Sequence, residues 1–162
     1  MKRRTFLTSV AATTLLGSAA RAAQGSFEVT HTEAEWRQML GDKAFQVMRR
    51  EGTERAFTSP LNDVKAEGTF HCRGCDKALY ASKTKFESGT GWPSFWAPLD
   101  GAVGTKDDPG FWGMRTEVHC SRCGSHLGHV FDDGPEPTGK RYCMNGVAMV
   151  FRPAAGGEPV VG

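Results

Sequence analysis

The sequence predicts a single, mainly β domain with short N-terminal helices. The chain has 162 residues, a length typical of one domain. It contains 20 glycines and 8 prolines, which favours many turns and short strands over long helices. Beyond residue 67 the apolar runs are short and end at Gly, Pro, Asn or Asp, as strands do. With 39% hydrophobic residues the chain has enough apolar material for a core.

Residues 1–22 have the pattern of an export signal. Lys2-Arg3-Arg4 forms a basic head, residues 5–20 are uncharged and fairly apolar, and Ala20-Arg21-Ala22 offers a small-x-small cleavage site. The apolar stretch is too short and too rich in Ser and Thr for a membrane anchor. The paired arginines favour the twin-arginine route, and a Sec signal is the alternative. We expect the mature protein to begin near Ala23 and to work in the periplasm.

Removal of this segment changes the net charge. The full sequence has a formal net charge of +2, and residues 1–22 hold four basic and no acidic residues, so the mature chain has −2. A slightly acidic protein has no general electrostatic attraction to nucleic acid or to an anionic membrane. Nucleic acid and anionic membranes are therefore not expected as partners.

Two helices are predicted at the start of the mature chain. Thr32-Glu33-Ala34-Glu35 fits a capping box, and apolar residues follow at helical spacing until Gly41. A second short helix begins after Asp42, and Gly52 is expected to close it in the left-handed conformation. Both helices are interpreted as structural.

A turn-rich connector at residues 58–63 leads into the predicted strands. The strand candidates are residues 68–72, 78–82, 94–97, 113–119, 128–131, 140–143 and 147–152. We expect an ordered core at about residues 30–153 within a domain of residues 23–162. The tail at residues 154–162 is rich in small residues, Gly and Pro, and is expected to fray.

Four of the five cysteines form two Cys-x-x-Cys pairs, Cys72 with Cys75 and Cys120 with Cys123. Two intervening residues let a tight turn place both sulfurs on one metal, and two such turns complete a tetrahedron. The pairs predict a structural zinc site with no open coordination position. Disulfides formed after export and a thioredoxin-like redox pair are the alternatives. Iron is a possible replacement for zinc during overexpression.

The fifth cysteine, Cys143, has no partner in this arrangement. It is either a buried small side chain or a reactive thiol, and Arg141, two residues away on the same strand face, favours the thiolate. His126 and His129 follow the second cysteine pair. Because four sulfurs already serve the metal, these histidines are better interpreted as proton donors or packing groups than as ligands.

Four sequence blocks are distinctive: residues 88–95 (SGTGWPSF), 115–118 (RTEV), 126–131 (HLGHVF) and 141–145 (RYCMN). Together they resemble the signature motifs of the B-type methionine sulfoxide reductases, and the resemblance runs over about residues 33–151. The resemblance implies one domain of two coiled antiparallel sheets, with a structural zinc site distant from the active site. It implies reduction of the R epimer of methionine sulfoxide, free or in oxidised proteins and peptides.

The resemblance also implies the roles of the catalytic residues. Cys143 is the expected nucleophile, which attacks the sulfoxide sulfur and keeps the oxygen as a sulfenic acid. Because a sulfoxide is a poor electrophile until its oxygen is protonated or hydrogen-bonded, the site needs acids, and His126, His129 and Asp133 match those positions. Asn145 is expected to help orient the sulfoxide group of the substrate. Arg141 (RYCMN block) is expected to support the thiolate.

Trp92 matches the aromatic wall that receives the substrate methyl group, and Phe131 is expected to border the same pocket. In this sequence Thr90 takes the position where many relatives carry a resolving cysteine. We therefore expect an external thiol, thioredoxin-like or small, to reduce the sulfenic acid on Cys143. Asp132 replaces a proline that is common in relatives, and it adds a carboxylate that is expected to be solvated.

Residues 110–113 (GFWG) look like a block of the unrelated A-type reductases but lack its cysteine, so Phe111 and Trp112 are interpreted as packing residues. We expect a monomer. The alternatives to the enzyme are a zinc-ribbon binding module without catalysis and a general thiol–disulfide oxidoreductase.

Overall fold

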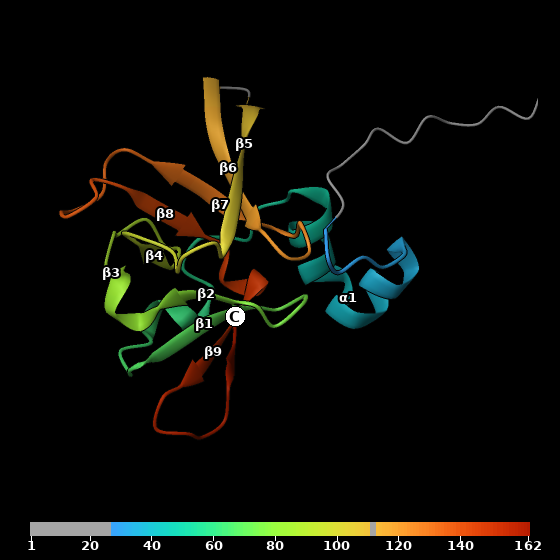
Figure 1. Ribbon diagram of the computed structural model, residues 1–162, viewed down its shortest axis with the longest axis horizontal. Helices are drawn as coiled ribbons and strands as arrows, with labels where there is room; N and C mark the ends of the chain where they lie inside the picture. The colour runs from blue at the N-terminus through green and yellow to red at the C-terminus, as the bar shows by residue number, and fades with distance from the viewer. Residues whose placement is uncertain (1–26, 111–112) are drawn as a thin grey trace, which may run out of the picture.

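The computed structural model describes residues 27–110 and 113–162 (Figure 1). The predicted export signal at residues 1–22, its cleavage position, and the predicted packing residues Phe111 and Trp112 lie outside these ranges.

The N-terminal helical segment α1 (Glu33–Arg50) contains a break at Gly41, whose φ of 74° and ψ of 163° are not helical. This confirms the two helices predicted on either side of that glycine. The capping box is also confirmed, because the Thr32 hydroxyl accepts from the Glu35 amide while the Glu35 carboxylate accepts from the Thr32 amide. The predicted closure at Gly52 is wrong: Glu51 takes the left-handed conformation, with φ 56°, and its amide donates to the Gln46 carbonyl. Within the described ranges, no helix combines the length and apolar character needed to span a membrane.

Two antiparallel sheets make up most of the domain, which confirms the predicted fold class (Figure 1). The smaller sheet has the order β10-β9-β1-β2 and contains β1 (Gly68–Cys72), β2 (Ala78–Ala81), β9 (Met149–Pro153) and β10 (Val160–Val161). The larger sheet has the order β3-β4-β8-β7-β6-β5 and contains β3 (Lys85–Phe86), β4 (Ser94–Phe95), β5 (Val103–Gly110), β6 (Gly113–Cys120), β7 (His126–Phe131) and β8 (Arg141–Met144). Short 3-10 helices η2 (Ser82–Thr84) and η3 (Gly146–Ala148) connect the two sheets, and a further one, η1 (Pro60–Asp63), leads from α1 into β1.

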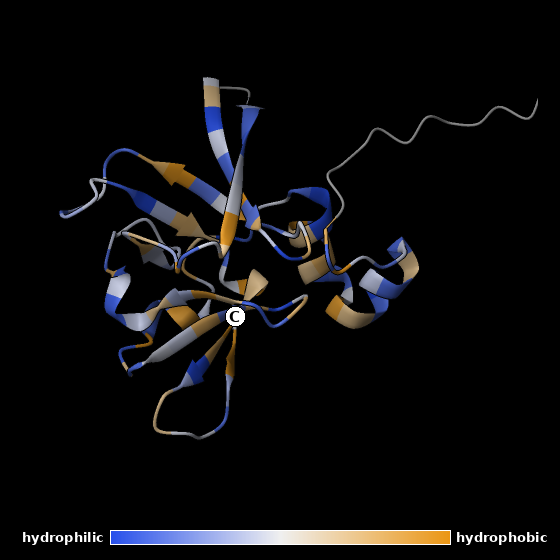
Figure 2. Cartoon of the chain, viewed as in Figure 1, coloured by the Kyte–Doolittle hydropathy of each residue, from blue (hydrophilic) through white to orange (hydrophobic). Residues whose placement is uncertain are grey.

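The structure differs from the predicted strands in several places: β3 was not predicted, and β7 begins at His126, two residues before the predicted start. The start of the predicted strand at 147–152 belongs to η3, and β9 begins only at Met149. Strand β5 was not predicted, because it is hydrophobic only at its start and hydrophilic toward its outer end (Figure 2). The expectation of a frayed tail is wrong, because β10 pairs with β9 and the Gly162 amide donates to the Met149 carbonyl at 3.2 Å.

The core between the sheets is aromatic. Phe70 and Phe151 of the smaller sheet contact each other with ring centroids 4.9 Å apart, and Phe70 lies equally close to Phe95 of the larger sheet. Tyr80 stacks on Phe95 at 4.3 Å and donates its hydroxyl to the Met144 sulfur at 3.1 Å. Each such ring contributes roughly 2 kcal/mol on burial. Because Met144 ends β8, this packing fixes the strand that carries Cys143.

Candidate active site and metal centre

The four cysteines of the two Cys-x-x-Cys pairs lie together, with all four sulfurs within 4.8 Å of one another. The Sγ atoms of Cys72 and Cys123 are 3.7 Å apart, and those of Cys75 and Cys120 are 3.5 Å apart. Sulfurs bound tetrahedrally at about 2.3 Å, the zinc–sulfur bond length, lie about 3.8 Å from one another. The cluster is therefore positioned to bind one metal ion.

The same cluster joins the two sheets. Cys72 and Cys75 lie at the turn from β1 to β2 of the smaller sheet, and Cys120 and Cys123 lie at the turn from β6 to β7 of the larger one. All five cysteines of the chain are in the described ranges and none forms a disulfide. Hydrogen bonds with the Cys120 sulfur, and to a smaller extent with the Cys123 sulfur, raise the pKa of the Cys72 thiol well above its usual value. A bound cation would favour the thiolate form of Cys72, which the neighbouring cysteines and burial disfavour.

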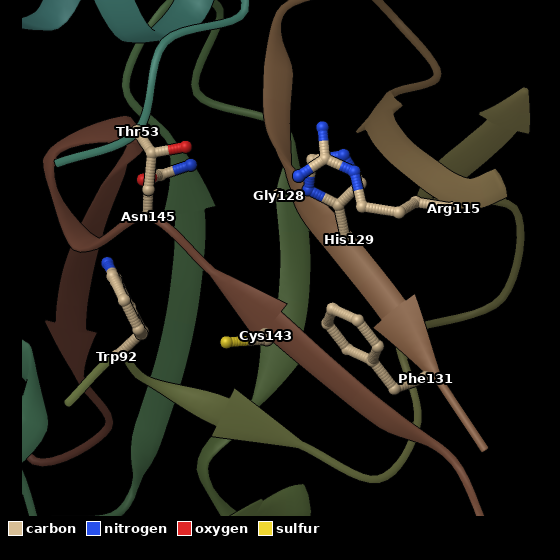
Figure 3. Close-up of a pocket in the computed structure, with 8 residues that line it drawn as sticks. All are labelled: Thr53, Trp92, Arg115, Gly128, His129, Phe131, Cys143 and Asn145. Atoms are coloured by element: carbon tan, nitrogen blue, oxygen red, sulfur yellow. The ribbon is translucent and has the colours of Figure 1, made fainter. Parts of the chain in front are cut away.

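Cys143 lies apart from this cluster, in a cleft of about 160 Å³ on the larger sheet. The cleft is lined by Thr53, Trp92, Arg115, Gly128, His129, Phe131, Cys143 and Asn145 (Figure 3). In this view the Cys143 sulfur projects toward Trp92, and Phe131 lies on the other side of Cys143. A hydrogen bond fixes the Trp92 ring, because its Nε1 donates to the Glu54 carbonyl at 3.2 Å. The cleft thus pairs a cysteine sulfur with two aromatic side chains.

Strand register places the polar residues of the site in one row. His129 of β7 lies directly opposite Cys143 of β8, Ser94 of β4 is opposite Cys143 on its other side, and Glu117 of β6 is opposite His129. Directly opposed residues in an antiparallel sheet share a face. Ser94, Cys143, His129 and Glu117 therefore point to the same side of the sheet.

A β-bulge adds His126 to this face. Two residues that are three apart on a regular strand point to opposite faces. The register between β6 and β7 shifts at Val118/His119, so that Leu127 is the extra residue and His126 pairs with His119. His126 and His129 therefore share a face, with ring centroids 5.4 Å apart.

Each histidine contacts a different carboxylate. His126 Nδ1 lies 2.8 Å from Glu117 Oε1, and both side chains are buried. His129 Nε2 lies 2.7 Å from Asp108 of β5, which also accepts from Arg115 at 2.6 Å. Burial lowers the pKa of His129 below its ordinary value, although the Asp108 contact opposes this shift. The hydrogen bond from His129 also lowers the pKa of Asp108, so the carboxylate is ionised near neutrality.

Asn145 lines the cleft, and its amide is held by backbone groups on two sides. Its Oδ1 accepts from the Glu54 amide at 2.9 Å, and its Nδ2 donates to the Leu127 carbonyl at 3.1 Å. The Glu54 carboxylate in turn accepts from the amides of Gly146 and Val147 at 2.5 and 3.0 Å. Glu54 and Asn145 thus fix the chain directly after Cys143.

Arg141 and Asp133 form an ion pair beside the cleft, outside the residues that line it. The Arg141 guanidinium donates two hydrogen bonds of 2.8 Å to the Asp133 carboxylate and lies over the Phe131 ring at 4.4 Å. The pair lowers the pKa of Asp133, so this carboxyl is ionised near neutrality. The geometry therefore favours Asp133 as the group that holds Arg141, in place of the acid expected from the sequence. Asp132 is exposed and pairs with Lys140.

Thr90 lies beside the cysteine, with its Oγ1 3.8 Å from the Cys143 sulfur. A chain of hydroxyl groups follows, because Ser88 lies 2.8 Å from Thr90 and 2.7 Å from Ser94. Thr90, the position where many relatives carry a resolving cysteine, thus lies next to Cys143.

Sequence reasoning missed Glu54, Asp108 and Glu117 as residues of the site. Glu117 belongs to the RTEV block, so a signal was present although no role was given to it. Glu54 and Asp108 are single acidic residues in segments without a motif. Only their three-dimensional contacts reveal them.

Comparison with known proteins agrees with this geometry. The SelR domain model matches residues 40–153. A protein of Pseudomonas putida (strain W619) named peptide methionine sulfoxide reductase MsrB is 51% identical over 130 residues, which are 80% of this chain and 98% of the relative. Relatives of the same name from Hahella chejuensis and Methanosarcina barkeri are 48% and 50% identical; the alignments cover 80% and 76% of this chain, and 94% and 88% of those proteins. The chain therefore belongs to the SelR domain family, together with proteins named peptide methionine sulfoxide reductase MsrB.

Proposed function

We propose that this protein reduces methionine-R-sulfoxide, free or within peptides and oxidised proteins, to methionine. The observation that carries the proposal is the placement of Cys143 in a cleft beside Trp92 and Phe131, with His129 directly opposite it. Aromatic side chains suit the apolar methyl and methylene groups of the substrate, and the histidine side of the cleft suits its oxygen. Membership of the family supports the same reaction.

The chemistry assigns one step to Cys143. Its thiolate attacks the sulfoxide sulfur while a histidine gives a proton to the sulfoxide oxygen, which weakens the sulfur–oxygen bond. The attack forms a bond between the two sulfurs. The protonated oxygen then moves as a hydroxyl group to the Cys143 sulfur, and the sulfur–sulfur bond breaks with its electron pair on the substrate sulfur, which gives the sulfenic acid and releases methionine. Two electrons pass from the cysteine sulfur to the substrate sulfur, so the step consumes one thiolate and one proton. Arg141, which the Asp133 carboxylate holds in place, supports the thiolate by its charge.

An external reductant completes the cycle. With Thr90 beside Cys143 and the other four cysteines in the metal cluster, no second thiol adjoins the sulfenic acid. One thiol of the reductant displaces water from the sulfenic acid and forms a mixed disulfide. A second thiol releases Cys143 and leaves the reductant as a disulfide. We propose a thioredoxin-like protein or a small dithiol as this reductant, and we propose that the enzyme works as a monomer.

The metal is proposed to be Zn²⁺, held by Cys72, Cys75, Cys120 and Cys123. Four thiolates fill a tetrahedral coordination sphere, so the ion would stabilise the junction of the two sheets and leave the chemistry to Cys143. Metal analysis of the purified protein tests this, with one zinc per chain expected.

We also propose export through the twin-arginine signal at residues 1–22, with the mature protein in the periplasm. The basic head and the small-x-small site support it, and the family match begins later in the chain, at residue 40. Fractionation of cells with and without the paired arginines tests the proposal. Loss of the periplasmic pool is expected when Arg3 and Arg4 are both replaced by Lys, and an unchanged pool would contradict the twin-arginine route.

The test of the proposed reaction is turnover of the separated R and S epimers of a blocked methionine sulfoxide, with a chemical dithiol as reductant. The intact protein is expected to reduce R alone, and Cys143→Ser is expected to abolish the activity. Turnover of neither epimer by folded, metal-loaded protein would overturn the proposal. It would favour the zinc-ribbon binding module.

A further inference from the structure

We infer that Glu117 is a positioning residue that fixes the ring of His126 and leaves its Nε2 as the nitrogen that delivers a proton to the substrate oxygen. This inference rests on the proposed function and deepens it. The RTEV block that contains Glu117 has no role in the reaction described so far. The contacts of Glu117 provide one.

Glu117 and His126 form a buried carboxylate–imidazole pair. Their side chains are 3% and 2% exposed, and Glu117 Oε1 lies 2.8 Å from His126 Nδ1. Burial alone would raise the pKa of Glu117, but hydrogen bonds from His119 and His126 hold it well below its ordinary value. Glu117 is therefore ionised and accepts a hydrogen bond. His126 must then carry a proton on Nδ1.

The other oxygen of Glu117 is held from the opposite side. Oε2 lies 3.3 Å from His119 Nδ1 on β6 and 3.5 Å from the Lys106 ammonium on β5, which also pairs with Glu51 at 2.6 Å. These groups line a second cavity of about 380 Å³. With both oxygens engaged, the carboxylate has one orientation. The ring of His126 is held with it.

The remaining nitrogen of His126 is the unusual feature. Nε2 is buried, and among the described residues it has no hydrogen-bond partner. Buried polar atoms nearly always have one, because an unpaired atom costs free energy. The His126 ring meets the His129 ring at 5.4 Å, and His129 lies opposite Cys143 in the cleft. His126 is buried and is not among the residues that line the cleft, so the oxygen of a bound substrate that reaches past His129 would supply the missing partner.

The pair accounts for the proton that the reaction consumes. Protonated His126 carries hydrogen on both nitrogens, and the Nδ1 hydrogen stays with Glu117. The Nε2 hydrogen passes to the sulfoxide oxygen as the Cys143 thiolate attacks the sulfur. The resulting hydroxyl then moves to the Cys143 sulfur as the sulfur–sulfur bond breaks, which gives the sulfenic acid and methionine. Neutral His126 then regains a proton from water. A carboxylate that holds one imidazole nitrogen in this way selects the tautomer and stabilises the charged ring.

The groups that face the pair set the pH dependence of this step. Lys106 on β5 and His119 on β6 face Glu117, and His129 on β7 faces His126. Loss of the Glu117 charge removes the anion nearest to the protonated ring of His126. The alkaline limb of the pH–rate profile should then move to lower pH.

The variant Glu117→Gln tests the inference in the zinc-loaded protein, because Gln keeps the size of the side chain and removes its charge. We expect kcat/KM for methionine-R-sulfoxide to fall about 100-fold, as for loss of a general acid, with the alkaline limb at lower pH. Glu67→Gln, an exposed glutamate at the start of the smaller sheet, is the matched control and should keep the intact rate. Equal rates and pH profiles for Glu117→Gln and the intact protein would overturn the inference.

A second measurement keeps the inference testable if Glu117→Gln does not fold. Nitrogen-15 spectra of the histidine rings in the intact protein should show neutral His126 protonated at Nδ1 and bare at Nε2. Protonation at Nε2 in the neutral ring would overturn the inference. The two proposals fail separately: an intact protein without turnover contradicts the proposed function, whereas active protein with the other His126 tautomer contradicts only the role of Glu117.

Discussion

Replacement of Glu54 by Ala tests how the chain after Cys143 is held. Glu54 is 5% exposed, and its carboxylate accepts from the amides of Gly146 and Val147 at 2.5 and 3.0 Å. Ala removes both acceptors and leaves two buried amides unpaired. The backbone contacts of Glu54 to Asn145 and Trp92 remain, because they use its amide and carbonyl groups.

The expected loss of stability follows from these two contacts. A hydrogen bond to a charged group contributes about 1.5–3 kcal/mol, so loss of two lowers the free energy of unfolding by about 4 kcal/mol. For a domain of this size about 3 °C of Tm corresponds to 1 kcal/mol, which gives a fall of roughly 12 °C. Turnover should fall as well, because the loosened segment follows Cys143 directly.

Urea unfolding and calorimetry of the zinc-loaded protein measure this effect. Glu67→Ala is the matched control, because Glu67 is exposed, and it should change the free energy of unfolding by less than about 0.5 kcal/mol. A loss below about 1 kcal/mol for Glu54→Ala would refute the reasoning. It would mean that water replaces the carboxylate at both amides.

Three further predictions concern the metal, the cleft and pH. Chelation of the metal, or Cys72→Ser, should lower the free energy of unfolding by at least about 5 kcal/mol, and an unchanged Tm in calorimetry would contradict a structural ion. Thr90→Cys should form a disulfide with Cys143 after one turnover, because the Thr90 hydroxyl lies 3.8 Å from the Cys143 sulfur; mass spectrometry without reductant should find this bond only in the variant. Glu117 has a pKa below its unfolded value of 4.5, so its stabilising effect is complete above about pH 4.5 and is lost as the pH falls toward the folded value. The free energy of unfolding should therefore fall less steeply below pH 4.5 in Glu117→Gln, and parallel curves would contradict this.

Local patterns in the sequence predicted the elements that local interactions determine. The capping box at Thr32 and the break at Gly41 depend on neighbouring residues, and both were predicted. Strand β5 was missed because residues 105–109 (TKDDP) have low strand propensity, and pairing with β6 outweighs it. The tail was misjudged for a similar reason. Val160 and Val161 pair with β9, a contact that the composition of the tail conceals.

For the site, the motifs predicted which residues come together and missed how they are held. The blocks around Trp92, His129 and Cys143 lie far apart in sequence, and the fold brings all three to one cleft. The bulge at Leu127 that aligns the two histidines leaves no mark in the residue pattern. The bond between Asp133 and Arg141 was not predicted, because it depends on the turn between β7 and β8.

A single-turnover experiment tests the central claim most directly. Reduced, zinc-loaded protein is mixed with methionine-R-sulfoxide without any reductant, and the methionine released and the oxidation of each cysteine are measured. We predict about one methionine per chain, with one added oxygen on Cys143 as a trappable sulfenic acid and the four metal-cluster cysteines unchanged. Oxidation of the cluster cysteines to a disulfide, with Cys143 unmodified, would contradict the account and identify a thiol–disulfide oxidoreductase.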